Sequence, residues 1–321
     1  MTPSTATIYE YHEFPSPKAL RIHALLLAIA APLLLGGCAS IASRMVADAV
    51  SETGTTYARD DDPELVAAAV PFGLKTMEGL LDSQPEHQGL LLALTSGFTQ
   101  YGYAFVQQEA DAAELKGRNA ESRAARERAR KLYLRARDYG LRALDLRHPG
   151  LADRLRELKD LPKALSVARK PDVPLLYWTA AAWALAISNG KDRMDLVASL
   201  PAPGAMMTRA LELNESWDDG AIHEFFVAYD AARSAADGGG VARASEHYRR
   251  ALELSQGKKL GVKVNFAESV SVQAQDRAEF GRLLREVLAA DAEAEPRWRL
   301  ANTIARRRAR LLLEHAEDLF L

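Results

Sequence analysis

The sequence lacks several features from which a function is usually inferred first. Its 321 residues include a single cysteine, so no disulfide can form within the chain. Charge of neither sign prevails, because the formal net charge is −2 and the pI is about 6.4. This balance gives the chain no overall attraction to nucleic acid or to anionic lipid. Any electrostatic recognition must therefore be local.

Catalytic motifs are lacking as well. HEFFV at His223 resembles the start of a zinc-protease motif, but Val227 occupies the position of the second ligand. LTSGF around Ser96 lacks the first glycine of a nucleophile elbow, and neither a P-loop nor a dinucleotide-binding glycine pattern occurs. We therefore expect no enzymatic activity, no cofactor and no metal site, and we assign no catalytic residues.

The amino-terminal region lacks a hydrophobic run long enough to span a bilayer. The run from Ala24 to Leu35 would form a helix of about 18 Å, whereas the hydrocarbon core is about 30 Å thick. Lys18 and Arg21 precede this run, and a pair of small residues follows it. This arrangement is typical of an export signal. We predict that residues 1–37 are a signal peptide, and export in turn argues against a nucleic-acid partner.

The signal ends in LGGC, which resembles the lipobox of bacterial lipoproteins, in which the cysteine is diacylated and becomes the first residue. A lone thiol in an oxidising compartment favours lipidation of Cys38; the alternative is a chance cysteine beside a plain signal peptide. Ala39 rather than aspartate follows, which favours anchoring on the periplasmic side of the outer membrane. The polar, acidic stretch over 38–62 is expected to be a flexible tether, and residues 63–321 a single domain.

Helical periodicity dominates the rest of the chain. The acids of DDPE and Pro63 predict a helix start, because both are favoured in a first turn. A long helix with one apolar face is predicted from residues that recur at intervals of 3, 4, 3 and 4: Leu91, Leu94, Phe98, Tyr101 and Phe105. Sustained period-two alternation is lacking after Cys38. The sequence therefore predicts an all-α fold.

Short phrases repeat along this helical region. RALDL at 142–146 and RALEL at 209–213 and 250–254 are separated by 67 and 41 residues. The first spacing is close to twice the 34-residue tetratricopeptide period, and the second is one period with about seven extra residues. Ala244, Tyr248 and Ala251 match the second helix of that repeat, and the region around Trp178 matches the first. We expect an array of helical hairpins with degenerate tetratricopeptide-like repeats.

Basic residues are concentrated between Lys116 and Arg147, where eleven lysines and arginines face four acids. Two interpretations remain open. The stripe is either a solvated helix face held by ion pairs along the helix, or a docking surface for an acidic partner.

Aromatic and small residues gather in SGFTQYGYAF from Ser96, in PLLYWTAAAWALAISNG from Pro174 and in HEFFVAYDAA from His223. The second stretch would make a helix of only about 25 Å, too short to span a membrane. Such faces are either ordinary core or the lining of a channel between helices that suits an amphipathic guest.

Four segments resemble, in order, the T component associated with TRAP transporters (TatT): 63–107, 172–188 (DVPLLYWTAAAWALAIS), 261–288 and 297–320. The resemblance implies a periplasmic lipoprotein that self-associates, for instance as a trimer, and binds the substrate-binding P subunit of the transporter. It also implies a small hydrophobic ligand held in, or conducted through, a pore. The candidate lining residues on these motifs are Phe98, Tyr101, Tyr177, Trp178 and Trp183.

Two alternatives from other classes stay open. One is a helical-repeat scaffold lipoprotein in outer-membrane assembly that binds no ligand. The other is an exported hydrolase, which would require a cleft with a perturbed acid or histidine pair.

Overall fold

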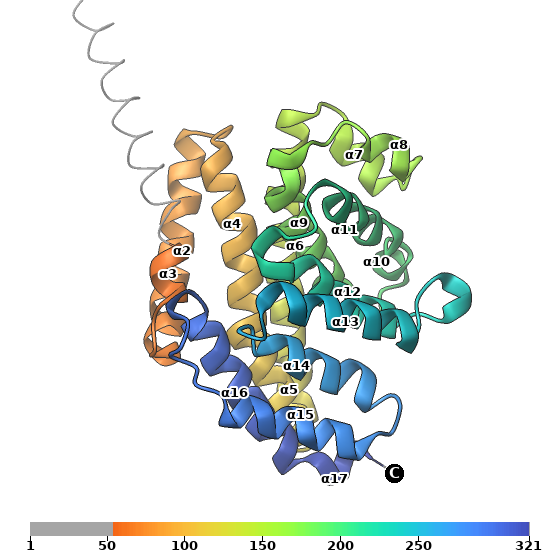
Figure 1. Ribbon diagram of the computed structural model, residues 1–321. Coiled ribbons are helices and arrows are strands. Elements are labelled where there is room, and N and C mark those ends of the chain that lie inside the picture. The colour runs from red at the N-terminus through yellow and green to blue at the C-terminus, as the bar shows by residue number, and fades with distance from the viewer. Residues whose placement is uncertain (1–53, 321) are drawn as a thin grey trace, which may run out of the picture. The chain divides into compact units, whose positions relative to one another are not determined.

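The computed structural model describes residues 54–320, and in this part of the chain all regular structure is helical (Figure 1). The predicted all-α class is therefore confirmed. Within the same residues no helix is both long and apolar enough to cross a membrane. The predicted signal peptide, Cys38 and the first part of the predicted tether lie outside the described residues.

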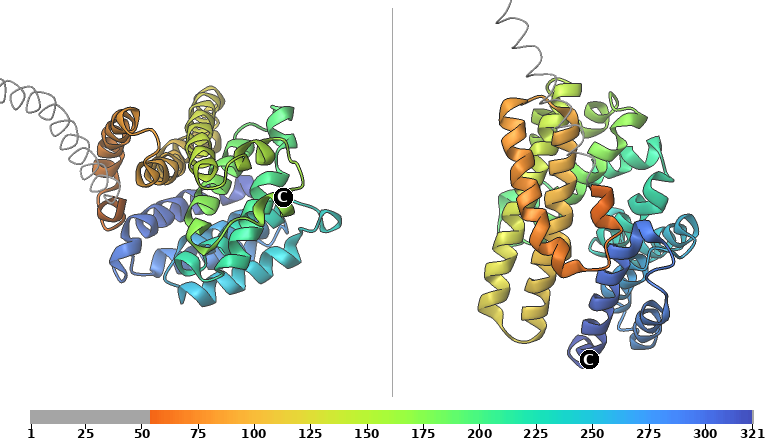
Figure 2. Two further views of the ribbon diagram at one scale, coloured as in Figure 1. Left: turned by 90° about the horizontal axis from the view of Figure 1, so that it is seen from above. Right: turned by 90° about the vertical axis from the view of Figure 1, so that its left-hand side faces the viewer.

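The first half of the fold contains the two longest described helices, α3 and α6. In chain order its elements are α2 (Gly54–Ala58), α3 (Pro63–Ser83), α4 (Gln88–Tyr101), the π-helical η1 (Gly102–Gln107), α5 (Gln108–Leu115), α6 (Asn119–Arg147), α7 (Leu151–Arg156), α8 (Leu161–Leu165), the 3-10 turn η2 (Lys170–Asp172) and α9 (Val173–Ser188). α4, η1 and α5 form one continuous helical rod that runs antiparallel to α6 (Figure 2).

Shorter helices complete the fold. They are α10 (Met194–Ala198), α11 (Pro201–Leu213), η3 (Trp217–Gly220), α12 (Ala221–Ala231), η4 (Ala235–Asp237), α13 (Val241–Ser255), α14 (Gly261–Phe266), the π-helical η5 (Ala267–Ser271), α15 (Arg277–Ala289), η6 (Pro296–Trp298), α16 (Arg299–Glu314) and α17 (Ala316–Leu319). α12 pairs with α13 and α15 with α16, while α9 lies against α4, α6 and α11.

The start of α3 follows the local sequence as predicted. The Asp62 side chain accepts a hydrogen bond from the Leu65 backbone N–H, and Pro63 occupies the first turn. Such a cap satisfies one of the amide groups that a helix start leaves without a partner. Val66, Met77 and Leu81 then face the core.

The predicted apolar face of the next helix is right only in its first half. Leu91, Leu94 and Phe98 are buried, but Tyr101 and Phe105 are only half-buried. The reason is the π-helical segment η1, whose wider turns shift the buried positions to Gly102, Val106 and Ala110. A Cβ atom on Gly102 would lie 2.8 Å from the Tyr133 ring, so the two helices approach most closely where the π-helix begins.

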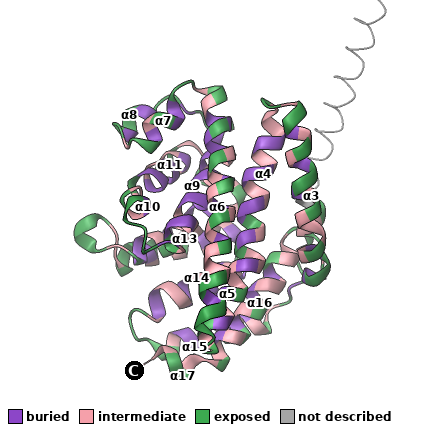
Figure 3. Cartoon of the chain, turned by 180° about the vertical axis from the view of Figure 1, so that it is seen from behind, coloured by how far each residue is buried: buried purple, intermediate pink, exposed green. Residues whose placement is uncertain are grey.

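The buried residues line the inward sides of the helices (Figure 3), and they form two clusters that meet at α12. The first extends from α3 to α12 and includes Phe226, and the second extends from α12 to the carboxyl end and includes Val227. Because neighbouring positions of one helix serve both clusters, α12 couples the two halves of the described fold.

The last long helix returns to the beginning of the described chain. α16 contacts both α2 and α3 (Figure 2). Arg307 pairs with Glu64, and the Arg299 guanidinium donates a hydrogen bond of 3.0 Å to the Arg59 carbonyl. The segment 38–62 was expected to be a tether. Its last residues include α2, which packs against the domain.

The repeated phrases fall at the ends of α6, α11 and α13. Ala244 and Ala251 are fully buried on α13, and Tyr248 stacks on Phe266 with ring centroids 4.1 Å apart. Small residues thus occur where paired helices pack closely. The tetratricopeptide-like nature of the pairs stays a prediction.

Candidate functional site

Two of the five predicted lining residues lie in the first core. Phe98 is 4% exposed and Trp183 is 2% exposed. The Trp183 indole N–H donates to the Ser199 hydroxyl at 2.8 Å, and the Arg137 guanidinium lies 5.2 Å from its ring centroid. Protein groups thus contact both the indole N–H and the ring of Trp183. Its role in ligand binding stays a prediction.

Tyr101 lies apart from these two residues, at the end of α4. Its ring contacts Phe105 at a centroid distance of 5.6 Å, and its hydroxyl accepts a hydrogen bond of 3.3 Å from Arg128. The side chain is half-buried between the rod and α6.

Tyr177 and Trp178 meet a third aromatic residue that sequence reasoning did not select, Trp217 of η3. The ring centroids of Tyr177 and Trp217 are 4.4 Å apart, those of Tyr177 and Trp178 5.0 Å, and those of Trp178 and Trp217 6.5 Å. The Trp178 ring is nearly perpendicular to both others, at 85° and 83°. All three side chains remain partly exposed, and we call this group the aromatic corner.

Carboxylates lie near the aromatic corner. Asp218 directly follows Trp217, and Glu224 is one turn into α12. Lys259 pairs with both of them, its Nζ atom lying 3.2 Å from Asp218 Oδ2 and 3.7 Å from a Glu224 carboxylate oxygen. Burial raises the pKa of both carboxyls, in spite of this shared cation.

Tyr103 in η1 was also missed by sequence reasoning. Its side chain is 45% exposed, yet burial raises the pKa of its phenol well above the usual range, and the nearby charge of Glu268 raises it further. Among the charged groups that act on the Tyr103 phenol are Glu268, Arg308 and Asp111.

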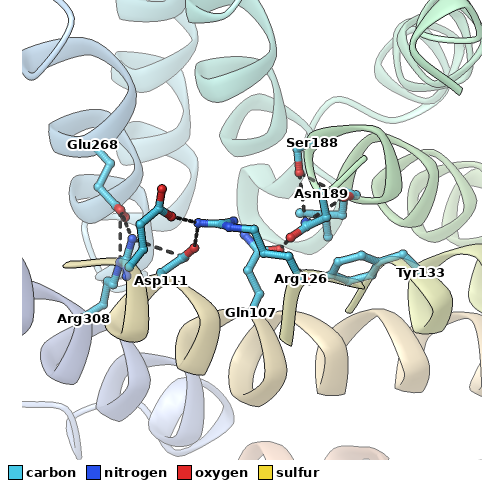
Figure 4. A network of polar contacts seen from close by, with 10 residues as sticks. Gln107, Asp111, Arg126, Tyr133, Ser188, Asn189, Glu268 and Arg308 are labelled. Carbon is cyan, nitrogen blue, oxygen red and sulfur yellow. Dashed lines mark hydrogen bonds and ion pairs between the residues drawn. The ribbon is translucent and has the colours of Figure 1, made fainter. Parts of the chain in front are cut away.

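Charged groups that act on Tyr103 connect the two halves of the fold, and Figure 4 shows Asp111, Glu268 and Arg308 among them. Arg308 of α16 pairs with Glu268 of η5, and its guanidinium lies 3.3 Å from a carboxylate oxygen of Asp111 in α5. Arg126 of α6 reaches the same aspartate at 2.8 Å. Both π-helical segments thus contribute to one region, since η1 carries Tyr103 and η5 carries Glu268.

A second polar chain continues from η1 into the first core. Gln107, the last residue of η1, accepts hydrogen bonds from the Tyr133 hydroxyl at 2.8 Å and from the Asn189 amide at 2.9 Å (Figure 4). π-Helical turns are uncommon and occur frequently at functional sites. The contacts of Gln107 hold the carboxyl end of η1 against the first core.

A separate cleft of about 520 Å³ between α12 and α13 contains a histidine pair. The Nδ1 atoms of His223 and His247 are 2.8 Å apart, and the second nitrogen of each ring faces a carboxylate, Glu215 at 3.2 Å and Asp230 at 3.5 Å. Burial lowers the pKa of His247 to about 4 and also lowers that of His223.

This cleft has the histidine pair that the hydrolase alternative required, but not the rest of such a site. Its lining, as far as the described residues show, consists of His223, Gly239, Ala242, Arg243, Glu246, His247 and Arg250, without serine, threonine or cysteine. Each histidine also directs one nitrogen at the other. The described residues contain no group of three or more side chains suited to a metal ion.

Most of the basic stripe on α6 is engaged in ion pairs. Arg130 pairs with Glu127, Arg147 lies 2.9 Å from Asp172, and Arg135 lies 3.5 Å from Glu78. A shallow surface hollow over 130–139 is lined by three of these basic side chains together with Asp138 and Tyr139. The contacts favour the solvated-face interpretation over the docking surface.

Fold and site together define the class of this molecule: an all-α protein of paired helices, with partly exposed aromatic side chains and with a charged network that joins its two halves. A family model described as TRAP transporter T-component matches residues 59–320, and the chain belongs to this family. A protein of Treponema pallidum (strain Nichols), named only as an uncharacterized protein, is 30% identical over 267 residues, which are 83% of this chain and 82% of that protein. The resemblance stated from the four motifs is thereby confirmed.

Proposed function

We propose that this chain is a lipid-anchored periplasmic accessory subunit of a TRAP-type transport system. It binds the substrate-binding P subunit and holds a small hydrophobic ligand, or conducts it, between the two halves of its helical fold. The observation that carries the proposal is the family match over residues 59–320, which spans the aromatic corner and Tyr103.

The interior groups support the ligand part of this proposal. Tyr177, Trp178 and Trp217 keep part of their surface exposed, and Tyr103 is 45% exposed. Aromatic rings with polar tips suit a guest that is apolar along most of its length and polar at one end. Self-association of the chain, for instance as a trimer, belongs to the same proposal.

Co-purification tests the proposed function. The full chain and a TRAP P subunit from the same genome are expressed together, and the complex is extracted and analysed by mass spectrometry for small molecules. We expect a stable complex and a bound amphiphile. A complex that does not form at micromolar concentration, with no extracted ligand, would favour the outer-membrane scaffold instead.

Anchoring is tested separately. Cys38→Ser removes the acyl acceptor, so we expect the variant to appear in the soluble fraction or to remain unprocessed, whereas the parent chain fractionates with outer membranes. Unchanged membrane partition of Cys38→Ser would rule out lipidation at this position.

A further inference from the structure

One exposed side of α3 is apolar along most of its length. Positions on this side recur at intervals of 3, 4, 4 and 3, all of them are exposed and none is charged: Leu65, Ala68, Phe72, Thr76 and Gly79. Leu65 is 58% exposed and Phe72 is 79% exposed. Single exposed hydrophobic residues are common, but the solvent side of a helix normally carries polar and charged side chains. We call these five residues the outer face of α3.

The polar groups on and beside the outer face are engaged within the chain. The Thr76 hydroxyl donates a hydrogen bond of 2.9 Å to the Phe72 carbonyl, and Lys75 pairs with Glu78. Interfaces between proteins normally carry about one hydrogen bond per 100–200 Å². The outer face therefore presents apolar surface to an occupant, and its one hydroxyl already has an acceptor in the same helix.

The outer face is also small for a contact between proteins. α3 has 21 residues and lies at the edge of the described fold, where it packs against α4 and α16 (Figure 1). Such a helix is about 31 Å long, so a stripe about 10 Å wide along it covers about 300 Å². A stable protein interface buries about 800 Å² on each partner. A lipid surface requires neither that area nor matching hydrogen bonds.

The place of α3 in the chain favours the same occupant. Sixteen residues lead from Cys38 to Gly54, where α2 begins, and α3 follows directly after α2. A chain of this length spans at most about 55 Å. Acylation of Cys38, as proposed above, therefore keeps α3 within reach of the lipid and gives the outer face a high effective concentration there.

We propose that the outer face of α3 lies on the zwitterionic lipid surface to which the chain is anchored, with Leu65 and Phe72 inserted at the headgroup level. Burial of their apolar surface stabilises the contact. The exposed acids Asp61 and Asp82 lie near the two ends of α3 and disfavour anionic lipid. Because acyl chains already attach the protein, the contact sets the orientation of the domain on the membrane. The inference rests on the proposed anchoring at Cys38.

A fluorescent label beside Phe72 tests the contact. Cys38 is the only cysteine and is acylated in the anchored protein, so Ala68→Cys supplies one free thiol for the environment-sensitive dye NBD. The labelled full chain is reconstituted on phosphatidylcholine vesicles with or without doxyl groups on the acyl chains. We expect the NBD emission to shift to shorter wavelength on the vesicles and to be quenched by the doxyl lipid. The same dye on Met194→Cys, at an exposed residue of α10, should show neither effect.

Two further variants determine whether the outer face itself makes the contact. Phe72→Asp and, independently, Leu65→Asp are introduced into the labelled Ala68→Cys chain, and each should abolish the shift and the quenching while the protein stays on the vesicles. Met194→Asp is the matched control, because Met194 is 74% exposed, and it should change neither signal. Circular dichroism shows that each variant folds.

The contact and the anchoring fail in different ways. If the protein stays on the vesicles and takes up one label that the doxyl lipid does not quench, the contact is wrong and the anchoring stands. Quenching that persists in both aspartate variants also overturns the contact. A shift that appears without vesicles and grows with protein concentration assigns the outer face to a second copy of the chain. Uptake of two labels shows that Cys38 is free, which overturns the anchoring and the contact together.

Discussion

At the scale of single residues, the histidine pair between α12 and α13 determines how stability responds to acid. His223 and His247 share one short contact between ring nitrogens, so at most one of the two can carry the proton there without a clash of donors. Burial lowers the pKa of both rings, in spite of Glu215 and Asp230 nearby, and the charges of Arg243 and Arg250 also oppose protonation.

We predict from this pair that the protein loses stability as the pH falls below about 6.5. The pKa of His247 is about 4 in the folded protein, against 6.5 for an ordinary histidine such as that of the unfolded chain, so protons bind the unfolded chain more readily. The stability that comes from keeping the His247 ring neutral is present above pH 6.5 and is lost as the pH falls towards 4. After allowance for solvent in the cleft it amounts to about 1–2 kcal/mol.

Urea denaturation at pH 7 and pH 5 measures this effect. His247→Phe keeps a ring against Phe226, which stacks on His247 at 4.8 Å, and should reduce the difference between the two pH values. His315→Gln, at a histidine outside the cleft, serves as the control. An equal pH dependence in His247→Phe and in the parent chain would show that the pair does not set this response.

At the scale of helices, close crossings depend on glycine. A Cβ atom on Gly140 of α6 would lie 2.1 Å from the Thr179 hydroxyl of α9 and 3.0 Å from a Thr95 methyl of α4. Gly140→Ala should therefore destabilise the fold by about 1–3 kcal/mol through overpacking. Gly79 is an exposed residue of α3, and nothing lies within 4 Å of a Cβ atom placed on it. Gly79→Ala should therefore stabilise the fold by about 0.5–1 kcal/mol. Thermal unfolding compares the two, and a stabilised Gly140→Ala would contradict the crossing geometry.

The helices also show how far a sequence determines a structure. Period, proline and capping residues predicted the class of fold and the start of α3, because these signals are local. The π-helical segment η1 was not predictable in this way, since it forms where Gly102 meets Tyr133 and Gln107 meets Asn189, and these partners are distant in sequence. Its effect was to displace the predicted face after Phe98.

The aromatic corner shows the same difference between local signals and partners that are distant in sequence. Tyr177 and Trp178 were identified because they stand in a conspicuous aromatic stretch, and both belong to the aromatic corner. Trp217 stands in a polar loop, NESWDDG, so nothing nearby in sequence distinguished it. Tyr103 is two residues after the predicted lining residue Tyr101. What distinguishes it is the nearby charge of Glu268, which is distant in sequence.

At the scale of the whole molecule, Arg308 connects the last long helix to both halves of the fold. Its side chain is 11% exposed, and its guanidinium faces Glu268 of η5 and Asp111 of α5. Arg308→Met would leave two largely enclosed carboxylates without this cation, so we expect a loss of about 3 kcal/mol in the free energy of unfolding.

Arg310→Met changes an exposed arginine two positions further along α16 and should leave stability nearly unchanged. Guanidinium denaturation of the two variants and the parent chain provides the comparison. Equal midpoints for Arg308→Met and the parent would mean that the network of Figure 4 does not hold the halves together.

The central claim concerns the partner, and the most direct test is the affinity of the full chain for a P subunit encoded in the same genome. Membership of the T-component family predicts specific binding, with a dissociation constant of about 10 μM or tighter, measured by calorimetry at physiological salt. A substrate-binding protein from an unrelated transporter should give no heat. Absence of binding to the P subunit at about 100 μM would contradict the account.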